Sequence, residues 1–168
     1  MAYQFMPMYN IDYPVGVGQQ NDSRDVMLVQ LLFLAYDRAT QFQHYVDSLC
    51  GRTQIMVPHG RFHSGMDNWI MAFQATNRSM PQDGKILPIP ASGGTFVPIT
   101  GGVSSTLAVL NYNALVAAPM AYRHIADRMQ LTIKRNIPLS SMSPLAQQGR
   151  SNPTAFGQGA SQRGILPP

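Results

Sequence analysis

The stretch NDSRDVMLVQLLFLAY, residues 21–36, limits the fold more strongly than any other part of the sequence. Asn21 or Ser23 can accept hydrogen bonds from the free amides of a helix start, and Asp25 suits the positive end of the helix dipole. Apolar residues follow at helical spacing, but they also cover the other sides of the helix: Val26, Leu28, Val29, Leu31, Leu32, Phe33, Leu34 and Tyr36. A single apolar stripe cannot account for this pattern. We therefore expect a helix that is buried nearly all round.

The helical pattern is compatible with one helix that continues through DRATQFQHYVDSL, residues 37–49. Phe42, Tyr45, Val46 and Leu49 are its apolar positions, and Gly51 would supply a left-handed conformation at its end. The most apolar run, residues 26–36, is interrupted by Gln30 and is far shorter than the roughly 20 residues that cross a bilayer. We expect no membrane insertion.

A second helix is predicted after the turn VPHGRF, in which Gly60 can adopt a positive φ. Ser64 is a suitable N-cap for GMDNWIMAFQATN, where apolar residues recur at helical spacing: Met66, Trp69, Ile70 and Phe73. Trp69 offers a surface for stacking on a sugar or a partner, but its place among these apolar positions favours the core. Later, DGKI repeats the order of residue types in HGRF, which is a weak internal repeat.

Two further segments near the middle of the chain have helical patterns. Ser104 or Ser105 can cap STLAVLNYNALVAA, and Leu107, Leu110, Ala114 and Leu115 lie on one side of that helix. Pro119 either interrupts this helix or starts a fourth one, MAYRHIADRMQ, with apolar residues Tyr122, Ile125 and Met129. Residues 131–137 have a β-like composition. The predicted fold is thus mostly α, a small orthogonal three-helix bundle with a fourth helix and short turns.

Both ends of the chain are predicted to be extended arms. Residues 1–20 show no sustained periodicity, and their start lacks the features of a signal peptide. We therefore expect synthesis in the cytoplasm. Residues 138–168 are dominated by Pro, Gly, Ser and Gln, a composition that cannot bury enough apolar area to fold alone. A partner surface would order this arm, with Phe156, Ile165 and Leu166 as its apolar docking residues.

The charge of the chain is low and unevenly distributed. Charged residues make up 12% of it, below the usual share of about 25%, and glutamate is absent. Such a composition is unusual for a free monomer. Every charged residue after Asp127 is basic: Arg128, Lys134, Arg135, Arg150 and Arg163. These cations are sparse and lack an aromatic platform, so we expect no nucleic-acid binding.

Few residues suggest catalysis, a metal or a cofactor. The spacing of His59, His63 and Asp67 would suit metal ligands on one helix face, but Gly60 and Gly65 interrupt that helix. We interpret both histidines as partly exposed turn residues.

Without glutamate, the chain lacks the usual carboxylates of a glycan hydrolase, and VGVGQQ is too incomplete for a dinucleotide loop. The single cysteine, Cys50, is expected to be a half-buried thiol and excludes an intrachain disulfide. No enzyme activity, metal or cofactor is predicted.

The order of these segments resembles the peptidoglycan-binding-like domain, a three-helix module, over roughly residues 15–116. The family combines a helix start Asp-Val-x-x-Val-Gln-x-x-Leu, a turn Asp-Gly-x-Phe-Gly and a helix Ala-Val-x-x-Phe-Gln. The matching residues here are Asp25, Val26, Val29, Gln30 and Leu32 or Phe33, then Gly60, Arg61 and Phe62, then Trp69, Ile70, Phe73 and Gln74. A second turn follows at Asp83, Gly84 and Ile86, and a closing helix at Thr106 and Leu110. His59 in place of the turn aspartate and an insert at about 88–103 depart from the family.

The resemblance implies a helical domain over residues 21–137, between an N-terminal arm (1–20) and a C-terminal arm (138–168). Its matched residues have structural roles, because the glutamines can bond the turn backbone and the glycines permit the turns. The candidates for binding are therefore the polar residues of the turns: His59, Arg61, His63 and Asp83.

Two functions follow from the resemblance as expectations. The first is a non-catalytic assembly subunit of a phage particle or of a contractile injection or secretion machine, with other subunits as its partners. The second is a stand-alone module that binds peptidoglycan and targets a separate hydrolase to the cell wall. We favour the first, and expect a macromolecular particle as the final location.

Overall fold

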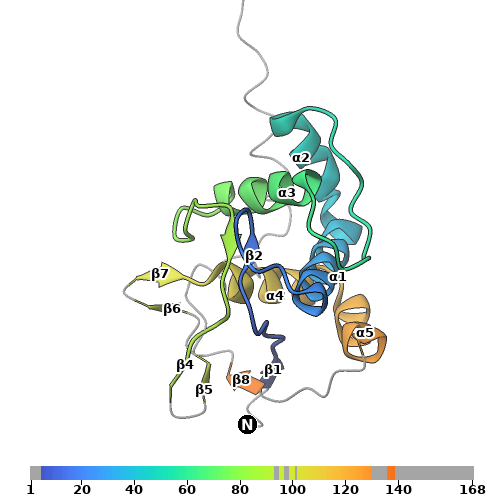
Figure 1. The fold of residues 1–168 in the computed structure, drawn as a ribbon. Coiled ribbons are helices and arrows are strands. Elements are labelled where there is room, and N and C mark those ends of the chain that lie inside the picture. Colours follow the sequence, from blue (N-terminus) through green and yellow to red (C-terminus); the bar gives the residue numbers. More distant parts are fainter. Residues whose placement is uncertain (1–4, 93–94, 97–98, 101, 130–135, 139–168) are drawn as a thin grey trace, which may run out of the picture.

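The computed structural model describes residues 5–92, 95–96, 99–100, 102–129 and 136–138 of the 168 residues. It is mostly helical, as predicted, with extended segments at both ends of the described part (Figure 1). The helices are α1 (Ser23–Thr40), α2 (Phe42–Cys50), α3 (Ser64–Ala75), α4 (Thr106–Ala117) and α5 (Pro119–Met129). The predicted fourth helix is thus confirmed as α5. Within the described residues, no helix is both long and apolar enough to span a membrane.

The strands are short and pair two by two, each pair antiparallel. β1 (Phe5–Pro7) pairs with β8 (Asn136–Pro138), and β2 (Val15–Gly16) pairs with β3 (Lys85–Ile86). Inside the predicted insert, β4 (Ala91–Ser92) pairs with β5 (Thr95–Phe96), and β6 (Ile99–Thr100) pairs with β7 (Val103–Ser104). The sequence patterns did not predict the insert strands.

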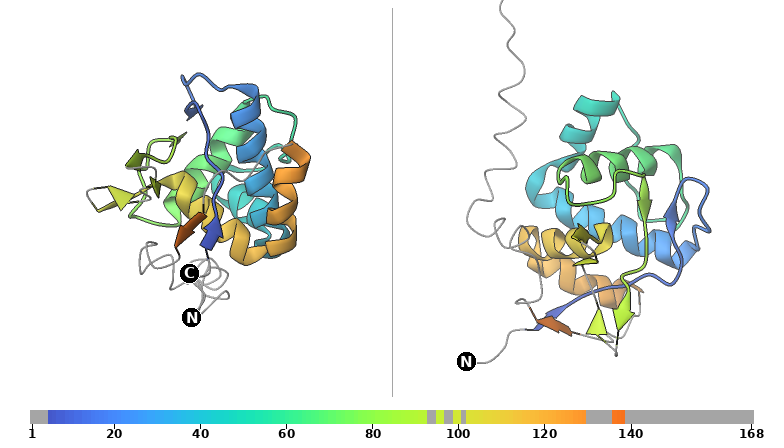
Figure 2. Two further views of the ribbon diagram at one scale, coloured as in Figure 1. Left: turned by 90° about the horizontal axis from the view of Figure 1, so that it is seen from below. Right: turned by 90° about the vertical axis from the view of Figure 1, so that its left-hand side faces the viewer.

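Helix α1 lies at the centre of the fold, with α3 on one side and α4 and α5 on the other (Figure 2). Its side chains are buried around most of its circumference, as predicted. Phe33 of α1 packs edge-on against Trp69 and Phe73 of α3, with ring centroids 5.6 and 5.7 Å apart. Trp69 is therefore a core residue, as its spacing indicated.

The helix expected to continue to Gly51 is instead divided at Gln41. This residue has φ 53° and ψ 42°, the left-handed region, which ends α1 and turns the chain into α2. Asp37 stabilises the break, because its carbonyl accepts from Gln41 N at 2.8 Å and its carboxylate accepts from Gln43 N at 2.7 Å. At the end of α2, Gly51 has a positive φ of 76°, but its ψ of −178° differs from the left-handed conformation that was predicted. Cys50 is exposed rather than half-buried.

The helix caps are partly as predicted. Ser105 caps α4 through a hydrogen bond from Ala108 N, as the sequence suggested. Helix α1 is capped by Asp22, not by Asn21 or Ser23, and α3 is capped by His63, not by Ser64. An N-cap residue has a non-helical backbone, and Asp22 (ψ 137°) and His63 (ψ 164°) have such a conformation directly before their helices.

The segment predicted as an N-terminal arm has no helix over residues 5–20, as expected, but much of it belongs to the core. Met8, Tyr9, Ile11 and Val15 are buried. Asn111 of α4, which is fully buried, accepts from Tyr9 N at 2.9 Å and donates to Tyr9 O at 3.0 Å. One side-chain amide thus binds both main-chain polar groups of an extended residue.

We predict that Asn111→Leu lowers the free energy of unfolding by about 3 to 5 kcal/mol, because leucine fills the space but leaves the Tyr9 main chain without its buried partners. Asn113→Leu on the same helix is the control, since Asn113 is partly exposed, and we expect a change within about 0.5 kcal/mol. Urea unfolding monitored by circular dichroism measures both. Equal, small effects would show that the Asn111 bonds contribute little.

Candidate functional site

The first glycine turn, residues 59–62, is held against α1 by the side chain of Gln30. Gln30 Oε1 accepts from His59 N at 3.0 Å and from Gly60 N at 2.9 Å, and its Nε2 donates to Arg61 O at 3.0 Å. The glutamine is fully buried in the middle of α1. This confirms the prediction that Gln30 bonds the turn backbone, and it explains how a polar residue fits the apolar middle of α1.

The second glycine turn, residues 83–86, is held against α3 in the same way by Gln74. Gln74 Oε1 accepts from Gly84 N at 2.8 Å, and its Nε2 lies 2.9 Å from Lys85 O and 3.1 Å from Asp83 Oδ1. Gln74 is also fully buried, and its Nε2 reaches Thr106 Oγ1 of α4 at 3.2 Å. The predicted bond between Gln74 and turn backbone is therefore present as well.

Both glycines lie so close to a helix that a side chain has little room. Gly60 has φ 72°, and a Cβ there would lie 2.7 Å from Ser23 O of α1. Gly84 has φ 68°, and a Cβ there would lie 3.0 Å from the Met71 sulfur and 3.3 Å from Asp67 Oδ1 of α3. The weak repeat in the sequence thus corresponds to two structural units, each with a helix, a buried glutamine and a glycine turn.

The four predicted binding residues are divided between the two turns. His59, Arg61 and His63 belong to the first turn and the chain that leads into α3, and the His59 and His63 rings lie 5.5 Å apart. Asp83 lies in the second turn, where its carboxylate accepts from Lys85 N at 3.0 Å. No hydrogen bond or ion pair joins Asp83 to the other three in the described part of the chain. The predicted docking residues Phe156, Ile165 and Leu166 lie outside the described residues.

His63 has a structural role at the start of α3. Its Nδ1 accepts from Met66 N at 3.3 Å, while its Nε2 is buried without a hydrogen-bond partner. Burial lowers the pKa of this imidazole, and the neighbouring His59 lowers it further. Asp67 lies one turn further along α3, where burial raises the pKa of its carboxyl group. Within the ranges that the structure describes, no three His, Cys or Asp side chains come together as a metal site would require.

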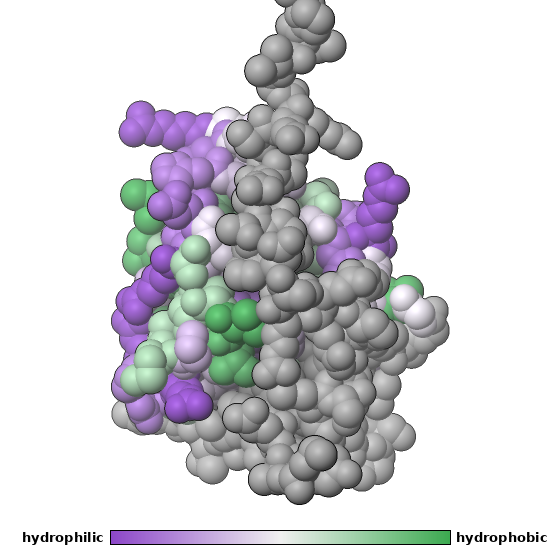
Figure 3. Space-filling model, turned by 180° about the vertical axis from the view of Figure 1, so that it is seen from behind, coloured by the Kyte–Doolittle hydropathy of each residue, from purple (hydrophilic) through white to green (hydrophobic). Residues whose placement is uncertain are grey.

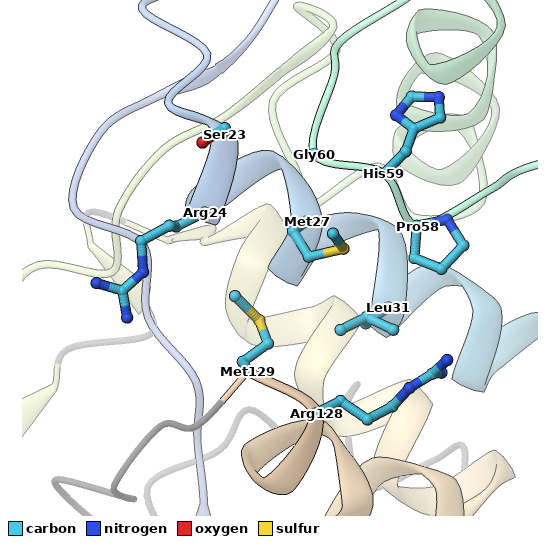
Figure 4. Close-up of a pocket in the computed structure, with 9 residues that line it drawn as sticks. All are labelled: Ser23, Arg24, Met27, Leu31, Pro58, His59, Gly60, Arg128 and Met129. Carbon is cyan, nitrogen blue, oxygen red and sulfur yellow. The ribbon is translucent and has the colours of Figure 1, made fainter.

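A groove that the sequence did not predict borders the first turn (Figure 4). Its volume is about 420 Å³, and it lies where the start of α1, the turn and the end of α5 meet. Its lining residues are Ser23, Arg24, Met27, Leu31, Pro58, His59, Gly60, Arg128 and Met129. Of the predicted binding residues, only His59 contributes to this lining. Sequence reasoning missed Met27, Arg128 and Met129 because only the packing of α5 on α1 brings them together.

Comparison with known proteins identifies no relative: no family model, curated protein or solved structure matches the chain.

We predict that Gly60→Ala lowers the free energy of unfolding by about 3 kcal/mol, because it adds a contact with Ser23 O to the cost of a positive φ. Gly18→Ala is the matched control: Gly18 has φ 70°, but a Cβ there would meet nothing within 4 Å. For it we expect a loss of about 1 kcal/mol. Denaturant unfolding of both variants measures the difference, and equal losses would contradict a close approach of turn and helix.

We also predict that acid destabilises the fold through His63. The pKa of His63 lies below its ordinary value of 6.5 in the folded chain, so the unfolded chain takes up this proton at a higher pH. The free energy of unfolding therefore falls as the pH drops through 6.5 and levels off below the folded pKa. Protonation of Nδ1 would also remove the acceptor for Met66 N.

The measurement is thermal unfolding between about pH 8 and about pH 5. His63→Asn is the control, because asparagine keeps a side-chain oxygen for the cap but does not titrate. The wild-type chain should lose more stability over this range than the variant. Parallel pH profiles for the two chains would contradict the assignment to His63.

Proposed function

We propose that the chain is a non-catalytic interaction and assembly subunit built on a peptidoglycan-binding-like module. The observation that carries this proposal is the paired arrangement of buried glutamine and glycine turn, Gln30 with Gly60 and Gln74 with Gly84. It supports the resemblance at the positions where the family motifs match. The proposed setting, a phage particle or a contractile injection or secretion machine, comes from family analogy alone.

The use of the polar groups in both turns supports a role without catalysis. Gln30 and Gln74 bind main-chain groups, and Asp83 accepts from a main-chain amide of its own turn. His59 Nδ1 accepts from Arg61 N, and His63 Nδ1 accepts from Met66 N. A nucleophile or general base needs its reactive atom free to face a substrate. In these turns the two glutamine amides, the Asp83 carboxylate and the Nδ1 atoms of His59 and His63 instead bind the backbone.

The surface supports an assembly role. Several large apolar side chains are well exposed, among them Ile55 (71%), Met120 (65%) and Leu49 (54%). Seen from behind, hydrophobic residues lie between hydrophilic ones, with a compact group of strongly hydrophobic residues near the middle (Figure 3). Charged residues make up only 12% of the chain, so few charges solvate this surface. Contacts with neighbouring subunits would remove its exposed apolar side chains from water.

We predict that deleting residues 139–168 abolishes assembly and leaves the helical circular dichroism unchanged. The deletion keeps β8 and its pairing with β1. A full-length chain with Phe156, Ile165 and Leu166 all replaced by serine should show the same loss, because it removes the apolar docking residues. Sedimentation and size-exclusion chromatography compare the three chains, and the spectrum checks the fold. Unchanged assembly of both variants, or lost helicity on deletion, would contradict this role for the arm.

A pull-down on insoluble peptidoglycan tests the alternative function. Saturable wall binding by a monomeric chain would favour stand-alone cell-wall recognition over assembly. Turnover of a substrate that disappears when His59, His63 or Asp67 is replaced would overturn the non-catalytic proposal altogether.

A further inference from the structure

The groove between α1 and α5 combines an apolar floor with positive charge. Met27, Leu31 and Met129 form the floor, and both methionines are only partly buried. In Figure 4 these three side chains lie near the middle of the groove, and Arg24 and Arg128 extend to opposite sides of it. Methionine side chains are flexible and polarisable, so they adapt to apolar side chains of different shapes.

The charge in this groove is not balanced by its own lining. None of the nine lining residues is acidic. Neither Arg24 nor Arg128 forms an ion pair or a side-chain hydrogen bond with another described residue. The carboxylates that neighbour these arginines in the sequence have other partners: Asp22 accepts from Arg24 N, Asp25 accepts from Tyr13 N, and Asp127 lies 3.3 Å from His124 Nδ1. Two exposed guanidinium groups are therefore available to carboxylates from outside the groove.

The groove continues along the contact between the two helices. A second hollow of about 530 Å³ shares Leu31 and Arg128 with the first and extends past Leu34 and Ala35 towards Met120 and Ile125. Asp37 and Asp127 also line this second hollow, so positive charge dominates only the first. Together the two hollows have room for several side chains of one short peptide.

We propose that this α1–α5 groove docks an acidic, amphipathic segment of a partner protein. Apolar side chains of the segment lie on Met27, Leu31 and Met129, and its carboxylates pair with Arg24 and Arg128. Arginine suits this role because its planar guanidinium binds a carboxylate through two parallel hydrogen bonds. The inference rests on the proposed interaction function and gives the chemistry of one partner.

Charge complementarity favours a partner protein over the chain itself. The C-terminal arm is a poor occupant, because the charged side chains after Asp127 are all basic and would face Arg24 and Arg128. A second copy of the body is also poorly suited. The chain has no glutamate, and five of its eight aspartates, Asp22, Asp25, Asp37, Asp47 and Asp83, already accept hydrogen bonds through their carboxylates within the fold.

A random dodecapeptide library displayed on a surface and selected against the full-length chain tests this inference. Enriched peptides should carry net negative charge and apolar residues. Their affinity, measured by fluorescence anisotropy with the synthesised peptides, should fall by about tenfold or more for the double variant R24Q/R128Q. The affinity should also fall as salt is raised. The matched control is R52Q/R78Q, because both arginines are exposed and lie outside the groove; it should keep the wild-type affinity.

Several results would overturn the inference. These are a selection without enrichment, enrichment of neutral or basic peptides, and equal affinity for the wild-type chain and R24Q/R128Q. Dissociation of a wild-type oligomer by R24Q/R128Q in sedimentation velocity would identify a second copy as the occupant. Loss of peptidoglycan binding in that variant would identify the wall. If the peptide results fail while assembly through the C-terminal arm persists, the groove inference is wrong and the proposed function stands.

Discussion

Three buried side-chain amides hold the non-helical parts of this protein to its helices. Gln30 binds the first glycine turn, Gln74 binds the second, and Asn111 binds the extended chain at Tyr9. All three amides are fully buried, so each must satisfy its own donors and acceptor inside the protein. The segments they bind form few hydrogen bonds with strands. The side-chain amides supply the main-chain hydrogen bonds that a sheet would otherwise provide. The turns are fixed in position although the strands are very short.

The position of α1 follows from the same constraint. A helix that is apolar nearly all round needs neighbours on every side. Two neighbours of α1 are not helices: the first glycine turn and the extended N-terminal segment. Gln30 brings the first turn onto α1, while Asp25 accepts from the main chain at Asp12 and Tyr13 and ties the N-terminal segment to its start. Burial raises the pKa of the Asp25 carboxyl group, and its two main-chain hydrogen bonds act against that rise. The polar residues of α1 thus direct how its apolar surface is covered.

The sequence predicted the features that depend on local pattern. Helical spacing identified the burial of α1 and Trp69, and the resemblance to the family motifs identified Gln30 and Gln74 as residues that bond the turn backbone. It did not predict the break at Gln41, because the residue in the left-handed conformation is a glutamine and not a glycine. Hydrogen bonds to Asp37 stabilise the break. Nor did it predict Asn111 bound to Tyr9 or the groove at Arg128, since both depend on segments far apart in the chain. Local patterns carry no information about such contacts.

The central claim is that buried amides, and not regular strands, fix the turns of this fold. Amide hydrogen exchange followed by NMR tests it without any substitution. If the claim holds, the amides of Tyr9, Gly60 and Gly84 exchange only through large opening of the fold, as slowly as amides within α1. The amide of Gly18, in an exposed turn, should exchange fast and serves as the internal reference. Exchange of Gly60 and Gly84 at the rate of Gly18 would contradict the claim.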